Sequence, residues 1–419
     1  MNRREFTAQL AGRLGSVAWA GAILGGARES LGASPTATEI QPVITGPVRN
    51  GIDVLVQNNF APLRQLRLGL ITNHTGQDAR RRATLDLLQN APGVKQVALF
   101  SPEHGIRGEF DEKIGDSVDR QTGLPVYSLY GERRTPAPAQ LAGLDALVYD
   151  IQDIGCRFYT YPSTMGLCLE AAARAKLKFF VLDRVNPING VALEGPVHQG
   201  ASSFTALHAL PLRHGMTVGE MARMFNAERN IHADLTVIPL EGWRRKMWFD
   251  ETGQPWTNPS PNLRSLAGAT LYPGLGLHET PLCVGRGTDK PFELVGAPYI
   301  DDVRLAAELR RAGLPGVGFV PIRFTPTYST FKDQPCAGVA CVITDREQMN
   351  AVDVGLTLAL TLQRLYPRDF ALAKFNTLLQ HPATLEAIKA EKPLAEIKQS
   401  WAVELAAFQK RRAPFLLYA

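Results

Sequence analysis

The sequence lacks the short motifs that identify common cofactor-dependent and serine-dependent enzymes. No G-x-G-x-x-G follows the first predicted strand, so nothing indicates a dinucleotide. G-x-S-x-G is absent, and so is S-x-x-K with its partner motifs, which argues against an esterase, an amidase or a β-lactamase-like enzyme. The five cysteines show neither C-x-x-C spacing nor a cysteine–histidine zinc pattern. Cys336 and Cys341 could pair, but buried small hydrophobic side chains are the favoured interpretation.

Long apolar runs and blocks of like charge are equally scarce. Beyond the N-terminus, no apolar run approaches the length of a membrane span. The net charge is +5, and it falls to about +3 without residues 1–33, which carry four Arg and two Glu. Without a Lys/Arg block or an aromatic stacking motif, this charge is too weak to indicate nucleic acid. Hydrophobic residues at 45% and charged residues at 20% are typical of a soluble globular protein with a substantial core.

The first 33 residues are typical of an export signal. Arg3 and Arg4 precede a weakly apolar stretch at 17–26, and a small-residue pattern near Ala33 suits signal peptidase. This organisation favours a twin-arginine signal peptide. A Sec signal or a short membrane anchor is the alternative, but the apolar run is too short and too rich in glycine for a good spanning helix. We therefore expect a periplasmic mature protein.

Strand-like and helix-like segments alternate after a polar linker at 34–47. Apolar runs predict strands at 67–72, 95–100, 125–129, 144–151, 178–182 and 235–239, and helices are predicted at 79–89, 164–176 and 217–228. Apolar strands separated by helices indicate a parallel sheet that is covered on both faces. We predict an α/β domain with a mostly parallel sheet over residues 45–250.

The chain changes character after this region. Residues 243–298 are crowded with Pro and Gly and show little periodicity, and a structureless segment of this length in an enzyme is usually functional. A helix at 301–312, strands at 318–324 and 338–344, and helices over most of 348–410 follow. We predict a smaller C-terminal α/β domain at 251–419, with an active-site loop at 256–298.

Polar clusters follow almost every predicted strand. Because ligands bind beyond the carboxyl ends of parallel strands, four clusters on one edge predict a single polar cleft. A single cluster would be weak evidence, since Asp and Asn also cap helices and form turns. The candidates are Asn73, His74, Glu103, His104, Asp153, Arg157, Tyr159, Tyr161, Asp183, Arg184, Asn186, Asn189 and, further on, Glu194.

Glu103 is the first candidate for a catalytic group. It leaves a buried strand through Pro102, and desolvation at the rim of a sheet raises the pKa of a carboxyl group into the range of a general acid. A turn cap or an ion pair with Arg107 is the alternative interpretation. His104 could orient Glu103, bind a hydroxyl or bind a metal, but no tight ligand spacing supports a metal site and we expect none.

The irregular segment supplies a second set of polar groups. Its prolines stiffen the backbone, and its Asn, Ser and Glu side chains offer hydrogen bonds to hydroxyls, while Trp256 and Tyr272 could stack on a sugar face. A long interdomain connection is the alternative, but long ordered loops tend to carry sites. The candidates are Asn258, Ser260, Asn262, Glu279 and Arg286.

Taken together, these segments resemble one family. The similar motifs are SPEHG at 101–105, DIQDIG at 150–155, RFYTY at 157–161, DRVNP at 183–187, LEGP at 193–196, NPSPN at 258–262 and GRGT at 285–288. In this order, from about residue 51 to the C-terminus, they are similar to the exo-acting β-N-acetylmuramidases of peptidoglycan recycling, a NamZ-like family formerly catalogued as a domain of unknown function. The coverage makes the resemblance specific.

The resemblance implies a Rossmann-like domain joined to a smaller C-terminal domain, with the site in the cleft between them. It implies that Glu103 is the catalytic acid/base, and Glu279 falls where the family has a glutamate. Glycoside hydrolysis normally pairs an acid with a base or a nucleophile, and Glu194 is a further candidate for the second group. No cofactor is required.

Muramic acid carries a lactyl carboxylate that needs a cation, and Arg binds carboxylates in a bidentate way. Arg157, Arg184 and Arg286 are the candidates. The expected partners are muramic acid glycosides derived from peptidoglycan, without nucleic acid and without a membrane span in the mature protein. A periplasmic sugar-binding protein and a different hydrolase on the same scaffold are the alternatives.

Replacement of both Arg3 and Arg4 by lysine should leave the precursor in the cytoplasm, because the twin-arginine route recognises the arginine pair. Cell fractionation with immunoblotting, beside the unaltered precursor, measures this outcome. Normal periplasmic accumulation of the double-lysine variant would contradict the predicted route.

Overall fold

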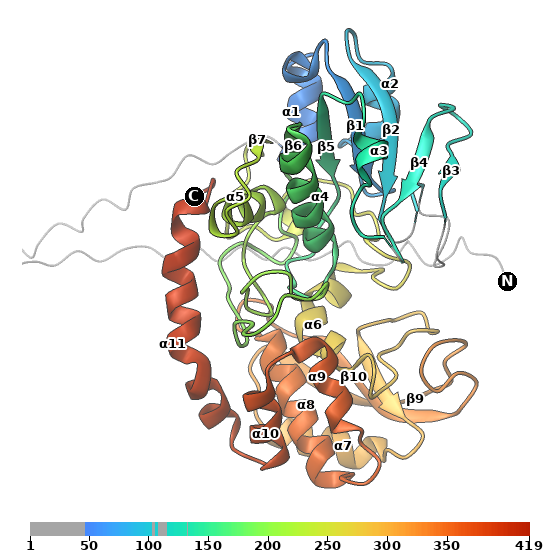
Figure 1. Cartoon of the computed structure of the whole chain (residues 1–419). Coiled ribbons are helices and arrows are strands. Elements are labelled where there is room, and N and C mark those ends of the chain that lie inside the picture. The colour runs from blue at the N-terminus through green and yellow to red at the C-terminus, as the bar shows by residue number, and fades with distance from the viewer. Residues whose placement is uncertain (1–46, 103–104, 108–114, 132) are drawn as a thin grey trace, which may run out of the picture. The chain divides into compact units, whose positions relative to one another are not determined.

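The computed structural model describes residues 47–102, 105–107, 115–131 and 133–419. The predicted site residues Glu103 and His104 and the predicted signal peptide lie outside these ranges. Within them the chain forms a sheet of seven strands and a sheet of three strands, each packed with helices (Figure 1).

The seven-stranded sheet has the order β3-β4-β2-β1-β5-β6-β7. Its strands are β1 (Arg67–Thr72), β2 (Lys95–Ser101), β3 (Ser117–Val118), β4 (Pro125–Ser128), β5 (Ala146–Asp150), β6 (Lys178–Leu182) and β7 (Asp234–Ile238). Neighbouring strands are parallel except for β3 and β4. The strand order reverses between β1 and β5, which is where doubly wound folds bind ligands. The predicted Rossmann-like parallel sheet is confirmed.

Helices cover both faces of this sheet, which explains why its strands are apolar on both sides. On one face Ile71 and Tyr149 pack in a core with α4 (Tyr161–Ala175) and α5 (Val218–Glu228). On the other face Leu70 and Val148 pack with α1 (Gly51–Gln57) and α2 (Thr84–Gln89). All five residues of β5 are buried, as a central parallel strand requires. The short helix α3 (Pro138–Leu141) precedes β5.

The three-stranded sheet is antiparallel, with the order β8-β10-β9, and belongs to the smaller C-terminal domain. Its strands are β8 (Leu294–Ala297), β9 (Val317–Phe324) and β10 (Cys336–Ile343). The helices are α6 (Leu266–Leu275), α7 (Asp302–Arg311), α8 (Ala351–Leu365), α9 (Leu372–Leu379), α10 (Pro382–Lys389) and α11 (Leu394–Arg412). No helix in the described ranges is long and apolar enough to cross a membrane.

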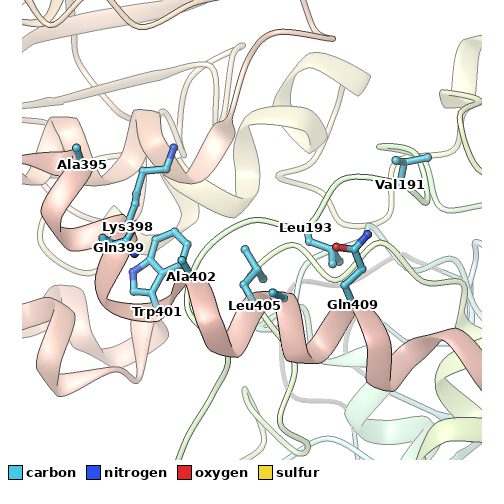
Figure 2. Close-up of a pocket in the computed structure, with 10 residues that line it drawn as sticks. Val191, Leu193, Ala395, Lys398, Gln399, Trp401, Ala402, Leu405 and Gln409 are labelled. Atoms are coloured by element: carbon cyan, nitrogen blue, oxygen red, sulfur yellow. The ribbon is translucent and has the colours of Figure 1, made fainter.

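The last helix returns from the C-terminal domain to the seven-stranded sheet (Figure 1). Phe408 of α11 joins the core that contains Tyr149, and the Tyr418 hydroxyl donates a hydrogen bond of 2.5 Å to Asp183. Figure 2 shows Leu405 and Gln409 of α11 beside Val191 and Leu193, which line an open groove of about 670 Å³. The C-terminal segment therefore ties the two sheets together.

Two predicted segments differ from the structure. The helix predicted at 79–89 begins only at Thr84, because the Asp78 side chain accepts hydrogen bonds from the backbone N–H groups of Arg80 and Arg82 and holds a turn there. The segment at 243–298 is not structureless, since it contains α6, β8 and two 3-10 turns. Pro273 lies inside α6, and a proline within an apolar run obscures the helical pattern.

All five cysteines are buried and free. Cys336 and Cys341 both belong to β10 and are five residues apart, so their side chains point to opposite faces of the strand and cannot pair. Burial raises the pKa of the Cys341 thiol to about 12. The interpretation as small hydrophobic side chains is confirmed.

His278 should make the fold sensitive to acid. Its ring is buried beside Phe375, its Nε2 lies 2.9 Å from the Gly355 carbonyl oxygen, and burial lowers its pKa from 6.5 to about 4. Stability that is present above pH 6.5 is therefore lost progressively as the pH falls from 6.5 to 4, by up to roughly 3 kcal/mol. His278→Gln can keep the donor without titrating, so its unfolding free energy should fall less between pH 7 and 4 in urea denaturation. Equal losses in the two proteins would refute this role.

Candidate active site

A cavity of about 210 Å³ lies between the segment that follows β5 and the irregular segment of the C-terminal half. This volume is small for a ligand pocket and suits one small ring better than a long chain. The lining combines aromatic rings, hydroxyl and amide groups and one residue of each charge. The lining residues are Phe158, Tyr159, Thr160, Tyr161, Thr205, Ser260, Asn262, Tyr272, Glu279, Arg286, Phe292 and Leu378.

Three tyrosines form an aromatic wall of this cavity. The Tyr159 ring lies edge-on to Tyr161, at 4.9 Å and 82°, and edge-on to Tyr272, at 5.9 Å and 87°. Tyr161 begins α4, and its carbonyl oxygen accepts a 3.0 Å hydrogen bond from the hydroxyl of Tyr149 on β5. Edge-to-face contacts and this bond fix the positions of the rings, so the wall is formed before a ligand arrives.

The irregular segment is anchored to the carboxyl edge of the sheet. His74 follows the end of β1 by two residues, and its Nε2 lies 2.8 Å from the Asn258 carbonyl oxygen. The Tyr161 hydroxyl donates a 3.2 Å hydrogen bond to the Pro259 carbonyl. Within the segment, the Ser260 hydroxyl accepts a hydrogen bond from Asn262 N–H at 3.3 Å. The predicted loop residues Asn258, Ser260 and Asn262 therefore lie at or beside the cavity.

An ion pair supplies both charges of the described lining. The Arg286 guanidinium contacts the Glu279 carboxylate, and the two side chains are 28% and 23% exposed. Glu279 directly follows the short 3-10 turn η3 (Gly276–His278) as its C-cap residue. The pair is thus accessible from the cavity, where it can bind polar groups of a ligand.

Arg157 lies behind the cavity wall. Its buried guanidinium donates hydrogen bonds to the carbonyl oxygens of Leu378 and Leu379 at 2.9 and 2.7 Å, and longer ones to Pro196 and Leu210. Burial lowers its pKa to about 10. Because these donors are committed to backbone, the structure does not present Arg157 to a carboxylate in the cavity.

The Arg184 guanidinium is also fully engaged in bonds to other protein groups. Its guanidinium binds both carboxylate oxygens of Asp150 at 2.5 and 2.9 Å, and it donates to the Gln77 carbonyl at 3.0 Å. The Arg184 and Asp150 side chains are 4% and 0% exposed. Of the three predicted arginines, only Arg286 lines the cavity.

Several other candidates build the carboxyl edge of the sheet. The Asn73 and Asn189 side chains accept hydrogen bonds from backbone N–H groups two residues further on, as turn-forming asparagines do. Asp153 accepts a bond from Gly155 N–H, and Asn186 bridges to the Met216 carbonyl. Asp183 accepts bonds at the start of α5, and burial raises its pKa to about 7. These residues shape the site from outside the cavity.

Glu194 connects the two halves of the fold. One carboxylate oxygen pairs with Arg213, and the other accepts a 3.1 Å hydrogen bond from the N–H of Val352, in the first turn of α8. Both side chains of the pair are almost completely buried. Glu194 is not among the residues that line the cavity.

Glu103 and His104 lie outside the described residues, but the strand that leads to them is clear. β2 ends at the buried Ser101, and Phe100 is in register with Ile71 of β1. Arg107 is the residue with which Glu103 would form an ion pair in the alternative interpretation. In the structure the Arg107 guanidinium pairs with the Asp119 carboxylate at 2.9 Å. In the described part of the chain, no group of three or more His, Cys, Asp or Glu side chains could hold a metal ion.

Sequence reasoning missed part of the lining. Thr205 and Leu378 come from segments without a motif, and they reach the cavity only because the chain folds back onto it. Tyr328, which bonds the Asn262 side chain, was also missed. Trp256 packs edge-on against Phe249 at 5.1 Å and lines a separate cavity of about 20 Å³. Of the two aromatic residues expected to stack on a sugar, Tyr272 alone lines the larger cavity.

Comparisons with known proteins agree over both halves of the chain. The family models described as Exo-beta-N-acetylmuramidase NamZ, N-terminal, and NamZ, C-terminal, match residues 68–267 and 270–418. The chain is 42% identical over 378 residues to the peptidoglycan beta-N-acetylmuramidase NamZ of Bacillus subtilis (strain 168), covering 88% of this chain and 91% of the relative. The fold also resembles crystal structures of two DUF1343 family proteins from Bacteroides fragilis NCTC 9343. One has a TM-score of 0.84 with 36% identity over 90% of this chain and 100% of that chain. The other has a TM-score of 0.72 with 30% identity over 89% and 99%.

The two ion pairs of the site should differ sharply in their effect on stability. Arg184→Met leaves the buried Asp150 carboxylate without its cation and should lower the unfolding free energy by roughly 3–5 kcal/mol. Arg286→Met removes a partly exposed partner and should cost less than about 1 kcal/mol. Urea denaturation of the two variants measures the difference. Comparable losses would show that Arg286 is as structural as Arg184.

Proposed function

The chain belongs to the exo-β-N-acetylmuramidase NamZ family, and on this premise we propose that it is a glycoside hydrolase that removes terminal N-acetylmuramic acid from peptidoglycan fragments. Both halves of the chain match this family. The observation that carries the proposal is the cavity, where an aromatic wall faces hydroxyl and amide groups and an accessible carboxylate–guanidinium pair.

The lining suits a single amino sugar. Apolar sugar faces stack on aromatic rings, which Tyr159, Tyr161 and Tyr272 supply. Thr205, Ser260 and Asn262 offer hydrogen bonds to hydroxyl and amide groups. The small volume supports exo action, because an end unit enters such a cavity more readily than the interior of a chain.

Glu103 is the proposed general acid/base. It is the glutamate of the SPEHG motif and follows the buried Ser101 by two residues. The carboxyl end of β2 lies beside that of β1, and His74 after β1 bonds the segment that carries Ser260 and Asn262. This arrangement supports a role for Glu103 at the same edge of the sheet.

Glu279 is the proposed second carboxylate. It lines the cavity, and its carboxylate pairs with Arg286, an arrangement that can serve a base or a stabiliser of positive charge. Glu194 fits this role less well, because both of its oxygens are committed to Arg213 and to α8. Arg286 is the proposed direct partner of the lactyl carboxylate.

The site of action is proposed to be the periplasm. The support is the Arg3–Arg4 pair with its apolar stretch, which favours twin-arginine export. Peptidoglycan lies on that side of the membrane, so substrate and enzyme would share a compartment.

Glu103→Gln should abolish most of the turnover. It keeps the shape of the side chain but removes the transferable proton, and general acid catalysis contributes about 10²–10⁴-fold. The loss should appear in kcat and should be larger for a natural muramic acid disaccharide than for the para-nitrophenyl glycoside, because para-nitrophenol leaves without protonation.

Glu279→Gln is the matched comparison, since a base or stabilising carboxylate is needed for both substrates and its loss should affect them alike. Equal losses on the two substrates in Glu103→Gln would move the acid role to another carboxyl group. Retained sugar binding without turnover in the unaltered protein would instead identify a binding protein.

A further inference from the structure

Arg157 is a buried cation that pairs with no carboxylate in the described part of the chain. Only 3% of the residue is exposed, and its four described hydrogen bonds all go to backbone carbonyl oxygens. Its Nε is also buried, and it has no hydrogen-bond partner among the residues that the structure describes. Buried charges are normally paired, and leaving one unpaired costs several kcal/mol. The carbonyl dipoles at the end of α9 compensate part of this charge, but no described carboxylate neutralises it, which calls for an explanation beyond packing.

The charge lies directly behind the wall of the cavity. Arg157 precedes Phe158, which lines the cavity, and it donates to the carbonyl of Leu378, which also lines it. The charge also acts on a neighbouring group: burial lowers the pKa of His381, the Glu404 carboxylate raises it, and the Arg157 charge lowers it again. A ligand in the cavity is thus separated from the guanidinium by about one layer of protein.

The charges on the described lining itself cancel. Glu279 and Arg286 are its only charged residues, and they pair with one another. Arg157 therefore adds a positive charge behind a described lining whose own two charges pair with each other.

We propose that Arg157 determines specificity by favouring a carboxylate-bearing sugar through the electrostatic field of its buried charge, which no described carboxylate neutralises, without touching the ligand. The inference rests on the proposed function. It adds a residue that determines specificity although it does not contact the ligand. Arg286 binds the carboxylate directly, whereas Arg157 acts through the wall.

The size of the effect follows from Coulomb's law. For a separation on the order of 8 Å and an effective dielectric constant of about 30, the interaction favours an anion over a neutral analogue by roughly tenfold. Salt should weaken this preference little, because a buried charge is screened less than an exposed one.

The test compares two substrates of nearly equal shape. One is para-nitrophenyl β-N-acetylmuraminide with a free lactyl carboxylate, and the other is its lactyl amide. The ratio of kcat/KM for acid over amide should be well above one in the unaltered protein. It should fall about tenfold in Arg157→Met, which lacks the charge, and should change less than about threefold in Arg157→Lys, which keeps it.

Arg412 offers a matched control. It is 5% exposed, burial lowers its pKa to about 10, and it too donates only to backbone carbonyls, among them Gly190 and Gly215. None of its hydrogen-bond partners lines the cavity. Arg412→Met should therefore lower stability, as Arg157→Met does, while it leaves the acid-to-amide ratio unchanged.

The outcomes separate the inference from the proposed function. An unchanged ratio in Arg157→Met, or an equal fall in Arg412→Met, overturns the field effect. If Arg157→Met does not fold, Arg157→Gln is measured in its place. An acid-to-amide ratio of kcat/KM near one in the unaltered protein also overturns the inference, and this result needs no variant. Failure to hydrolyse either muraminide overturns the proposed function itself, whereas equal hydrolysis of both leaves that function standing.

Discussion

The buried ion pair between Asp150 and Arg184 holds together the edge of the sheet on which the site is built. Asp150 ends β5, and its side chain also accepts a 2.5 Å hydrogen bond from Thr84 at the start of α2. Its backbone carbonyl accepts a 2.7 Å bond from Thr72 at the end of β1. One residue therefore joins the two strands at which the sheet order reverses. Asp150 therefore positions several segments at this edge of the sheet: the ends of β1 and β6, the start of α2 and the RFYTY segment that follows β5.

A second set of buried polar groups fixes the C-terminal half against the sheet. Glu194 accepts a hydrogen bond from the first turn of α8, and Arg157 donates to the last carbonyl groups of α9. Helix ends expose unpaired N–H and C=O groups, so each contact satisfies a group that burial would otherwise penalise. Because such bonds are directional, they hold the two halves in register more strictly than apolar contact alone. The cavity between Tyr159 and Glu279 depends on that register.

The three arginines show how burial assigns roles to residues of one type. Arg184 neutralises a buried carboxylate, Arg286 shares a partly exposed one, and Arg157 has none in the described structure. A guanidinium that is fully bonded to the protein cannot reorganise to grip a ligand. A partly exposed guanidinium can, and an uncompensated one acts at a distance through a medium of low dielectric constant. Specificity for an anionic sugar would then come from two sources, the direct contact with Arg286 and the electrostatic field of Arg157.

The sequence by itself determined the six parallel strands, β9 and β10, the smaller C-terminal domain and the family, but not the short strands β3 and β8. Continuous apolar runs such as 146–150 and the order of the motifs are local features that need no partner to be recognised. Within the site, Tyr159, Ser260, Asn262 and Arg286 were predicted, because motif residues at strand ends and in a stiff loop tend to converge. Tertiary structure alone decided that Arg157 and Arg184 turn away from the cavity, that Glu194 joins two domains, and that Thr205 and Leu378 complete the lining. The physical reason is that burial and hydrogen-bond partners depend on segments far apart in the chain, whose meeting no local pattern encodes.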